Sequence, residues 1–174
     1  MSASMSVLDA VRTKRAVRQF QDTPLPDDAV RAILNAGRRA QSAKNMQAWH
    51  FIAIQDRARL RALSNLGTWA GHLAGAALGV VLVTPPPEVR FSIMFDAGQA
   101  AAYMQLVAWE RGIGSCLATI YEVDACRELL GFPAELEARI ALSFGYPLTA
   151  DVLTQPPQTG GRRTLDEVVH WETW

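Results

Sequence analysis

The stretch from Asp96 to Arg111 contains no proline, holds five alanines together with Met104 and Leu106, and is followed directly by Gly112. Alanine, methionine and leucine are strong helix formers, and glycine commonly ends a helix. We therefore predict that this stretch forms the longest helix of the chain. Its small residues, such as Gly98 and Ala101, would allow another backbone to come close.

The rest of the sequence alternates between helical and strand patterns. Apolar residues recur at helical spacing in four further segments, which are residues 6–13, 25–37, 57–65 and 123–130. Short apolar runs that end at turn residues predict four strands, over residues 49–55, 78–84, 115–119 and 138–144. Residues 148–163 show no period and predict an extended segment before a short element at residues 165–171. Helices and strands are therefore interleaved.

Composition limits the class of protein. The 174 residues, 49% of them hydrophobic, suffice for a single globular domain spanning residues 1–174. Seventeen basic residues balance seventeen acidic ones, which argues against broad binding of nucleic acid or of an anionic membrane. The most apolar run, residues 73–83, is too short to cross a bilayer. Because the two cysteines are too few for a disulfide framework and no signal peptide is evident, we expect a cytoplasmic protein.

The three histidines, His50, His72 and His170, are far apart in the sequence. A metal site needs several ligands that can converge on one ion, and this spacing gives it little support. We expect no metal site and interpret all three as ordinary surface or core histidines.

Lys14, Arg15 and Arg18 form a basic cluster directly after the first predicted helix. Guanidinium and ammonium groups bind phosphate through charge-assisted hydrogen bonds, so this cluster is a candidate phosphate site. The alternative is a solvated helix end whose positive charges complement the helix dipole.

Two further clusters are polar or basic. Ser42, Asn45 and Gln47 lie in a loop before a predicted strand, and their amides and hydroxyl suit the polar atoms of a flavin pyrimidine ring or ribityl chain. An ordinary turn is the alternative. Arg162 and Arg163 follow two glycines that would let them approach a ligand, but arginines in a tail are more often exposed to solvent.

The order and spacing of these clusters resemble the nitroreductase family over nearly the whole chain. Lys14-Arg15-Ala16-Val17-Arg18-Gln19-Phe20 is similar to the family's Arg-Arg-Ser-x-Arg-x-Phe, and residues 40–49 are similar to its Ser-Pro-Ser-x-x-Asn-x-Gln-Pro-Trp loop. Residues 96–101 with Gly112-Ile113-Gly114-Ser115 resemble its central helix and the turn that follows. Gly145-Tyr146-Pro147 and residues 162–169 resemble two later motifs. No single motif is specific, but their joint order is.

The resemblance implies an α+β, nitroreductase-like fold, in which a central mixed sheet is flanked by helices. It also implies an intertwined homodimer built on the central helix, with one FMN in each of two interface sites. A C-terminal extension, residues 148–174, would pack on the partner subunit.

The residues that correspond to the family's cofactor site are Lys14, Arg15, Ala16, Arg18, Ser42, Ala43, Asn45, Gln47, Arg162 and Arg163. The resemblance implies that Lys14 and Arg15, with Arg162 or Arg163, approach the phosphate, while Arg18 lies near the pyrimidine ring. The loop residues would contact flavin, in part from the partner chain. Lys14 and Ala16 replace the family's arginine and serine, so a bidentate contact and a hydroxyl contact are lost. The chain between Trp69 and Ala97 is short, and the insertion that often covers the substrate pocket is missing.

The resemblance also implies an activity. A family member would pass a hydride from NADH or NADPH through flavin N5 to an electron-poor acceptor, a nitroaromatic or a quinone, by a ping-pong mechanism. Arg18 would give electrostatic support, and no side chain would be catalytic. Reductive dehalogenation and ring dehydrogenation stay open as other activities of the same fold. So do a flavin-binding sensor or carrier without turnover and a structural dimer whose motifs have decayed.

Overall fold

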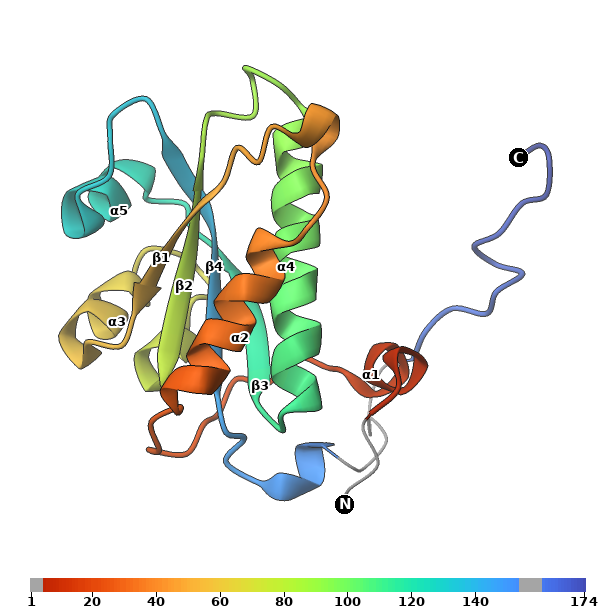
Figure 1. Ribbon diagram of the computed structural model, residues 1–174, viewed down its shortest axis with the longest axis horizontal. Helices are drawn as coiled ribbons and strands as arrows, with labels where there is room; N and C mark the ends of the chain where they lie inside the picture. The colour runs from red at the N-terminus through yellow and green to blue at the C-terminus, as the bar shows by residue number, and fades with distance from the viewer. Residues whose placement is uncertain (1–4, 154–160) are drawn as a thin grey trace.

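A four-stranded sheet forms the centre of the computed structural model, which describes residues 5–153 and 161–174 (Figure 1). The strands lie in the order β1-β2-β4-β3. Their bounds are β1 His50–Ile54, β2 Leu78–Thr84, β3 Gly114–Thr119 and β4 Glu137–Gly145. Each bound lies within one residue of the prediction, because turn-forming residues flank the apolar runs.

All neighbouring strands of this sheet are antiparallel. β2 and β3 run in the same direction because α4 (Ser92–Glu110) carries the chain back across the sheet between them. β4 then inserts between these two strands and runs against both. The expectation of a mixed sheet is therefore corrected for these four strands. Within the described residues, the parallel pairing is confined to an isolated bridge between Ala16 and Ser115.

Helices cover both faces of the sheet. α2 (Asp27–Arg38) and α4 pack on one face, whereas α3 (Arg57–Leu63) and α5 (Val123–Leu130) pack on the other (Figure 1). β2 is buried along its whole length because its side chains alternate between the two covered faces, with Val80 on the first and Val81 on the second. This arrangement confirms the predicted α+β fold. No helix among the described residues is long and apolar enough to span a membrane.

α4 is the longest helix, as predicted, and it begins at Ser92 rather than at Asp96 because no helix-breaking residue lies between them. Its open side carries Phe91, Phe95, Gly98 and Ala102, which are exposed, uncharged and close to helical spacing. A Cβ atom added at Gly98 would meet no other atom within 4 Å. The longest helix of the fold therefore leaves one uncharged stripe uncovered in the single chain.

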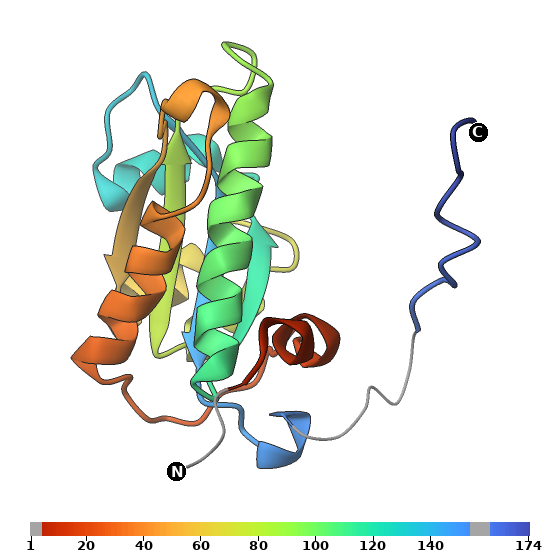
Figure 2. The same ribbon diagram turned by 45° about the vertical axis from the view of Figure 1, so that its right-hand side comes forward.

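The C-terminal region has two parts with different packing. η3 (Ala150–Leu153) folds back on its own chain, where Val152 and Leu153 contact Val17 and Trp109. Residues 161–174 lead away from the sheet, as Figure 2 shows, and form turns rather than the predicted short element. The remainder of the predicted extended segment, residues 154–160, lies outside the described residues. Packing on a partner therefore stays a prediction for residues 161–174, whereas residues 148–153 contact their own subunit.

Candidate functional site

The basic N-terminal segment, residues 14–19, lies beside the first residues of β3. It directly follows α1 (Val7–Thr13), which packs on α4. The Val17 N–H donates a 2.9 Å hydrogen bond to the Ser115 carbonyl. A Cβ at Gly114 would lie 2.6 Å from the Val17 side chain, so this close approach requires glycine. Two of the motifs found in the sequence therefore meet at one edge of the sheet.

Basic side chains from both ends of the chain affect one another's pKa at this edge. Burial, together with the nearby Arg162 guanidinium, lowers the pKa of Lys14. Burial also raises the pKa of the Cys116 thiol, although the charges of Arg18 and Lys14 oppose this change. In the part of the chain that the structure describes, no carboxylate forms an ion pair with Lys14, Arg18 or Arg162. Such a cluster of like charges is stabilised when an anion binds.

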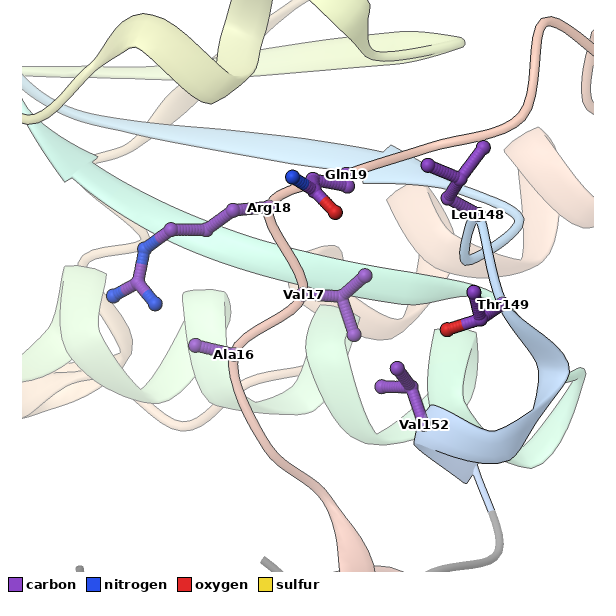
Figure 3. Close-up of a pocket in the computed structure, with 7 residues that line it drawn as sticks. All are labelled: Ala16, Val17, Arg18, Gln19, Leu148, Thr149 and Val152. Atoms are coloured by element: carbon purple, nitrogen blue, oxygen red, sulfur yellow. The ribbon is translucent and has the colours of Figure 1, made fainter. Parts of the chain in front are cut away.

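Two cavities adjoin this segment, and Arg18 and Gln19 line both of them. Val17 points toward Val152, beside a small cavity of about 270 Å³, whereas Arg18 extends to the opposite side (Figure 3). The Arg18 side chain also borders a larger cavity of about 640 Å³. This larger cavity is lined by Arg18, Gln19, Thr68, Trp69, Gly71 and His72.

His72 is a candidate site residue that sequence reasoning missed. It lies in η2 (Gly71–Gly75), is only 8% exposed, and borders the larger cavity. Its Nδ1 lies 2.7 Å from the Ser143 hydroxyl of β4. Burial, and secondly the Arg18 guanidinium, lower the pKa of the imidazole, although a backbone hydrogen bond with Leu117 opposes this change. A lone histidine carries no signal of this role in the sequence, because its partners are distant along the chain.

The polar loop at residues 42–47 has an unusual backbone. Lys44, Asn45 and Gln47 have φ angles of 54°, 55° and 49°, in the left-handed region that is costly for residues with side chains. The Ser42 hydroxyl accepts the Gln47 N–H at 2.9 Å, and the Gln47 amide donates to Asn45 Oδ1 at 3.1 Å. These local bonds hold the loop in a defined shape while Asn45 and Gln47 stay exposed.

The loop and the basic segment are anchored at different positions on α4. The Ala43 N–H, in η1 (Ala43–Asn45), donates to both carboxylate oxygens of buried Asp96, at 3.2 and 3.1 Å. Trp109 Nε1 donates to the Thr13 hydroxyl at 2.9 Å, directly before the basic segment. At about 1.5 Å per residue, these two anchors are roughly 20 Å apart along the helix. Within one chain, the loop and the basic cluster are therefore separated by most of the length of α4.

The predicted site residues thus divide into two groups. The structure brings together Lys14, Ala16, Arg18 and Arg162 near β3, with Arg15 in the same segment and Arg163 exposed beside Arg162. The second group lies at the other end of α4 and consists of Ser42, Ala43, Asn45 and Gln47.

Fold and site together define a class of protein: an α+β domain with an anion-attracting edge next to a cavity of ligand size. The model of the Nitroreductase family matches residues 11–146, which is most of the chain. The chain belongs to the nitroreductase family.

Individual relatives agree with this membership. A protein of Archaeoglobus fulgidus, named for NADH dehydrogenase and NAD(P)H nitroreductase activity, is 32% identical over 80% of this chain and 84% of its own. An NADH dehydrogenase of Thermus thermophilus is 25% identical over 98% of this chain and 100% of its own. The solved structure of an FMN-dependent nitroreductase of Clostridium difficile has a TM-score of 0.82 and 25% identity, covering 97% of this chain and 100% of that chain. The predicted nitroreductase fold is thereby confirmed.

Proposed function

We propose that this chain is an FMN-dependent oxidoreductase that takes reducing equivalents from NADH or NADPH and passes them to an electron-poor ring, a nitroaromatic or a quinone. The observation that carries the proposal is the basic cluster of Lys14, Arg18 and Arg162, which no described carboxylate neutralises and which shares Arg18 with the larger cavity. The names of the relatives from Archaeoglobus fulgidus and Clostridium difficile support the same nucleotide and cofactor.

The two chemical parts of FMN suit the two parts of this site. The phosphate carries nearly two negative charges, which Lys14 and Arg162 would neutralise. The larger cavity, of about 640 Å³, has a size typical of small-ligand sites. It combines polar groups, Arg18 and His72, with the flat side chain of Trp69, as a ring with a polar edge and apolar faces requires.

A second copy of the chain would complete this site, and we place the dimer contact on the uncharged stripe of α4. If α4 packs antiparallel on its copy, the start of one helix lies beside the end of the other. The loop anchored at Asp96 in one chain would then approach the basic segment anchored at Trp109 in its partner. The exposed residues Phe91 and Phe95 supply apolar surface for this contact.

The residues of the chain would hold and polarise the cofactor rather than react with it. When bound, FMN supplies a two-electron carrier that separates oxidation of the nucleotide from reduction of the acceptor, which makes turnover ping-pong. Arg18 would place a fixed positive charge beside the ring and so favour its anionic reduced form. Trp69, which is 81% exposed at the border of the cavity, offers a flat surface to an aromatic acceptor.

Absorption spectroscopy of the purified full chain tests the proposal. Protein reconstituted with FMN is expected to show a flavin spectrum that bleaches under anaerobic NADH or NADPH and recovers on addition of a nitroaromatic or a quinone. A bound flavin that neither nucleotide bleaches would indicate a carrier or sensor instead. Failure to bind added FMN would overturn the proposal.

A further inference from the structure

A basic cleft lies next to the larger cavity. The N-terminal segment lines the larger cavity with Arg18 and Gln19 and continues along the cleft with its next residues. In the same order, η2 lines the larger cavity with its first residues and the cleft with its last ones. The two cavities therefore follow one another along the same pair of segments. The basic cleft has a volume of about 370 Å³ and is lined by Phe20, Asp22, Arg57, Arg61, Ala74 and Gly75.

Two arginines of α3 give the cleft its charge. Arg57 and Arg61 are one helical turn apart, so they lie on the same side of the helix. Arg57 Nη1 donates to the Ala76 carbonyl at 3.1 Å, and the same guanidinium pairs with the carboxylate of Asp22. No carboxylate among the described residues pairs with Arg61. The cleft therefore keeps one positive charge that the described chain does not neutralise.

The cleft also offers an aromatic wall and open space. The ring of Phe20 is held close to Gly145, where an added Cβ would lie 2.9 Å from it. A Cβ added at Gly75 would meet no atom within 4 Å, so the backbone of η2 is open to a ligand there. A flat apolar ring beside guanidinium groups suits a ligand that joins an aromatic base to a phosphate.

We propose that the basic cleft binds the adenosine 2′-phosphate end of NADPH, so that the chain uses NADPH in preference to NADH. This inference rests on the proposed function and names the nucleotide for the same site. The nicotinamide would reach the flavin in the larger cavity. Arg18, in that cavity, and Asp22, in the cleft, are joined by at most about 14 Å of extended chain, a distance that an extended dinucleotide spans.

The charges of the cleft distinguish the two nucleotides. In dinucleotide sites, a carboxylate binds the ribose 2′-hydroxyl of NADH, whereas an arginine accommodates the 2′-phosphate of NADPH. A free carboxylate at Asp22 would favour NADH, but Arg57 already pairs with it. The guanidinium of Arg61 stays available for a phosphate, which it can bind through charge-assisted hydrogen bonds.

Arg61→Ala tests the cleft in the chain loaded with FMN. We expect the Kd for NADP⁺, measured by calorimetry, and the KM for NADPH to rise about 10-fold, as loss of a charge-assisted hydrogen bond does. The corresponding values for NAD⁺ and NADH, and the affinity for FMN, should stay unchanged. Arg59→Ala is the matched control, because Arg59 is exposed on the same helix and lines a different cavity beside β1 and α5.

Asp22→Asn tests the opposite change. Without its carboxylate, Arg57 loses a competitor of the phosphate, so NADP⁺ should bind about 3-fold more tightly, in line with the strength of an exposed ion pair. Arg57 keeps its hydrogen bond to the Ala76 carbonyl in this variant. A merely structural role of the cleft predicts no gain in affinity, and such a result would count against the proposal.

Each outcome decides the inference. Native affinity of Arg61→Ala for NADP⁺ would show that no 2′-phosphate binds in the cleft, and equal losses for NADP⁺ and NAD⁺ would remove the preference for NADPH; either result overturns it. Faster reduction of the native protein by NADH than by NADPH would overturn it as well. If neither nucleotide reduces the native protein loaded with FMN, the proposed function itself fails, and that failure is distinguishable because it appears before any substitution.

Discussion

The two halves of the proposed cofactor site differ in how one chain supports them. The basic half is bonded to β3 through the Val17 N–H; Lys14 is partly buried, Arg18 is exposed, and neither forms an ion pair with a described carboxylate. The polar half, with Asn45 and Gln47, is exposed, internally bonded and strained. A single chain can therefore preform a surface that attracts an anion, whereas the polar loop is anchored near the other end of α4. Strain of this kind persists where neighbouring contacts and function require it.

Complementation between two defective variants tests whether the halves come from different chains, and it has the largest expected effect. One variant carries Lys14→Ala with Arg18→Ala, and the other carries Asn45→Ala with Gln47→Ala. Each alone is expected to lose FMN binding. After joint unfolding and refolding, every mixed dimer should regain one intact site, counted by fluorescence titration. A mixture that binds no more FMN than its components would show that the halves do not join across chains.

Arg18→Ala sharpens the role of the basic half. Removing a fixed charge beside the ring should slow reduction of bound FMN by NADH or NADPH about 100-fold and lower the flavin reduction potential. Stopped-flow absorbance and potentiometry measure these two quantities. Arg38→Ala is the control, because Arg38 is exposed and bonds only Asn35 among the described residues. An unchanged reduction rate and an unchanged potential would show that Arg18 places no charge beside the flavin ring.

Replacing Arg162 and Arg163 together by alanine tests the C-terminal contribution to the same half. We expect the dissociation constant for FMN to rise about 30-fold, since charge-assisted hydrogen bonds to the phosphate are lost. Binding of riboflavin should not change. Calorimetry with both ligands gives the comparison, and an equal loss for riboflavin would argue against a phosphate contact.

Asp96→Asn addresses the polar half. The buried carboxylate accepts the Ala43 N–H, and neutralising it weakens the support of the loop. We expect FMN affinity to fall about 10-fold through loss of loop order. Asp28→Asn is the matched control, because Asp28 is an exposed partner of Arg111 and surface ion pairs contribute little. Equal effects of the two changes would contradict the anchoring role.

The pH dependence of binding provides the smallest effect. Burial and Arg162 lower the pKa of Lys14 below the ordinary value of 10.5. Because only the ammonium form attracts phosphate, FMN affinity should be retained below this lowered pKa and fall about 5-fold as pH rises through it. Lys14→Arg should abolish this alkaline loss, since guanidinium stays charged. An identical alkaline profile in both proteins would exclude Lys14 as its cause.

The strands and α5 were predictable because their signals are local. β2 occupies the predicted residues, where a valine-rich run meets prolines, and α5 ends at Gly131, whose φ of 70° suits a helix C-terminus. The short C-terminal element was expected but forms only turns, since residues 165–171 pack on no neighbouring element that would stabilise a helix in the described chain.

The motif residues of the candidate site could be found in the sequence, but their grouping could not. His72 was interpreted as an ordinary histidine because Ser143 and Arg18, which lie near it in the fold, are distant in the sequence. The loop residues were found, yet their separation from Lys14 follows from the length of α4.

By itself, the sequence determined where helices and strands lie and which residue types carry charge and amides, because these depend on neighbours within a few positions. Only the tertiary structure decided that Arg162 lies close enough to Lys14 to lower its pKa, that His72 lies beside Ser143, and that the polar loop lies at the far end of α4. Strand order and chain direction set such distances, and they arise from burial of the whole core rather than from any one segment.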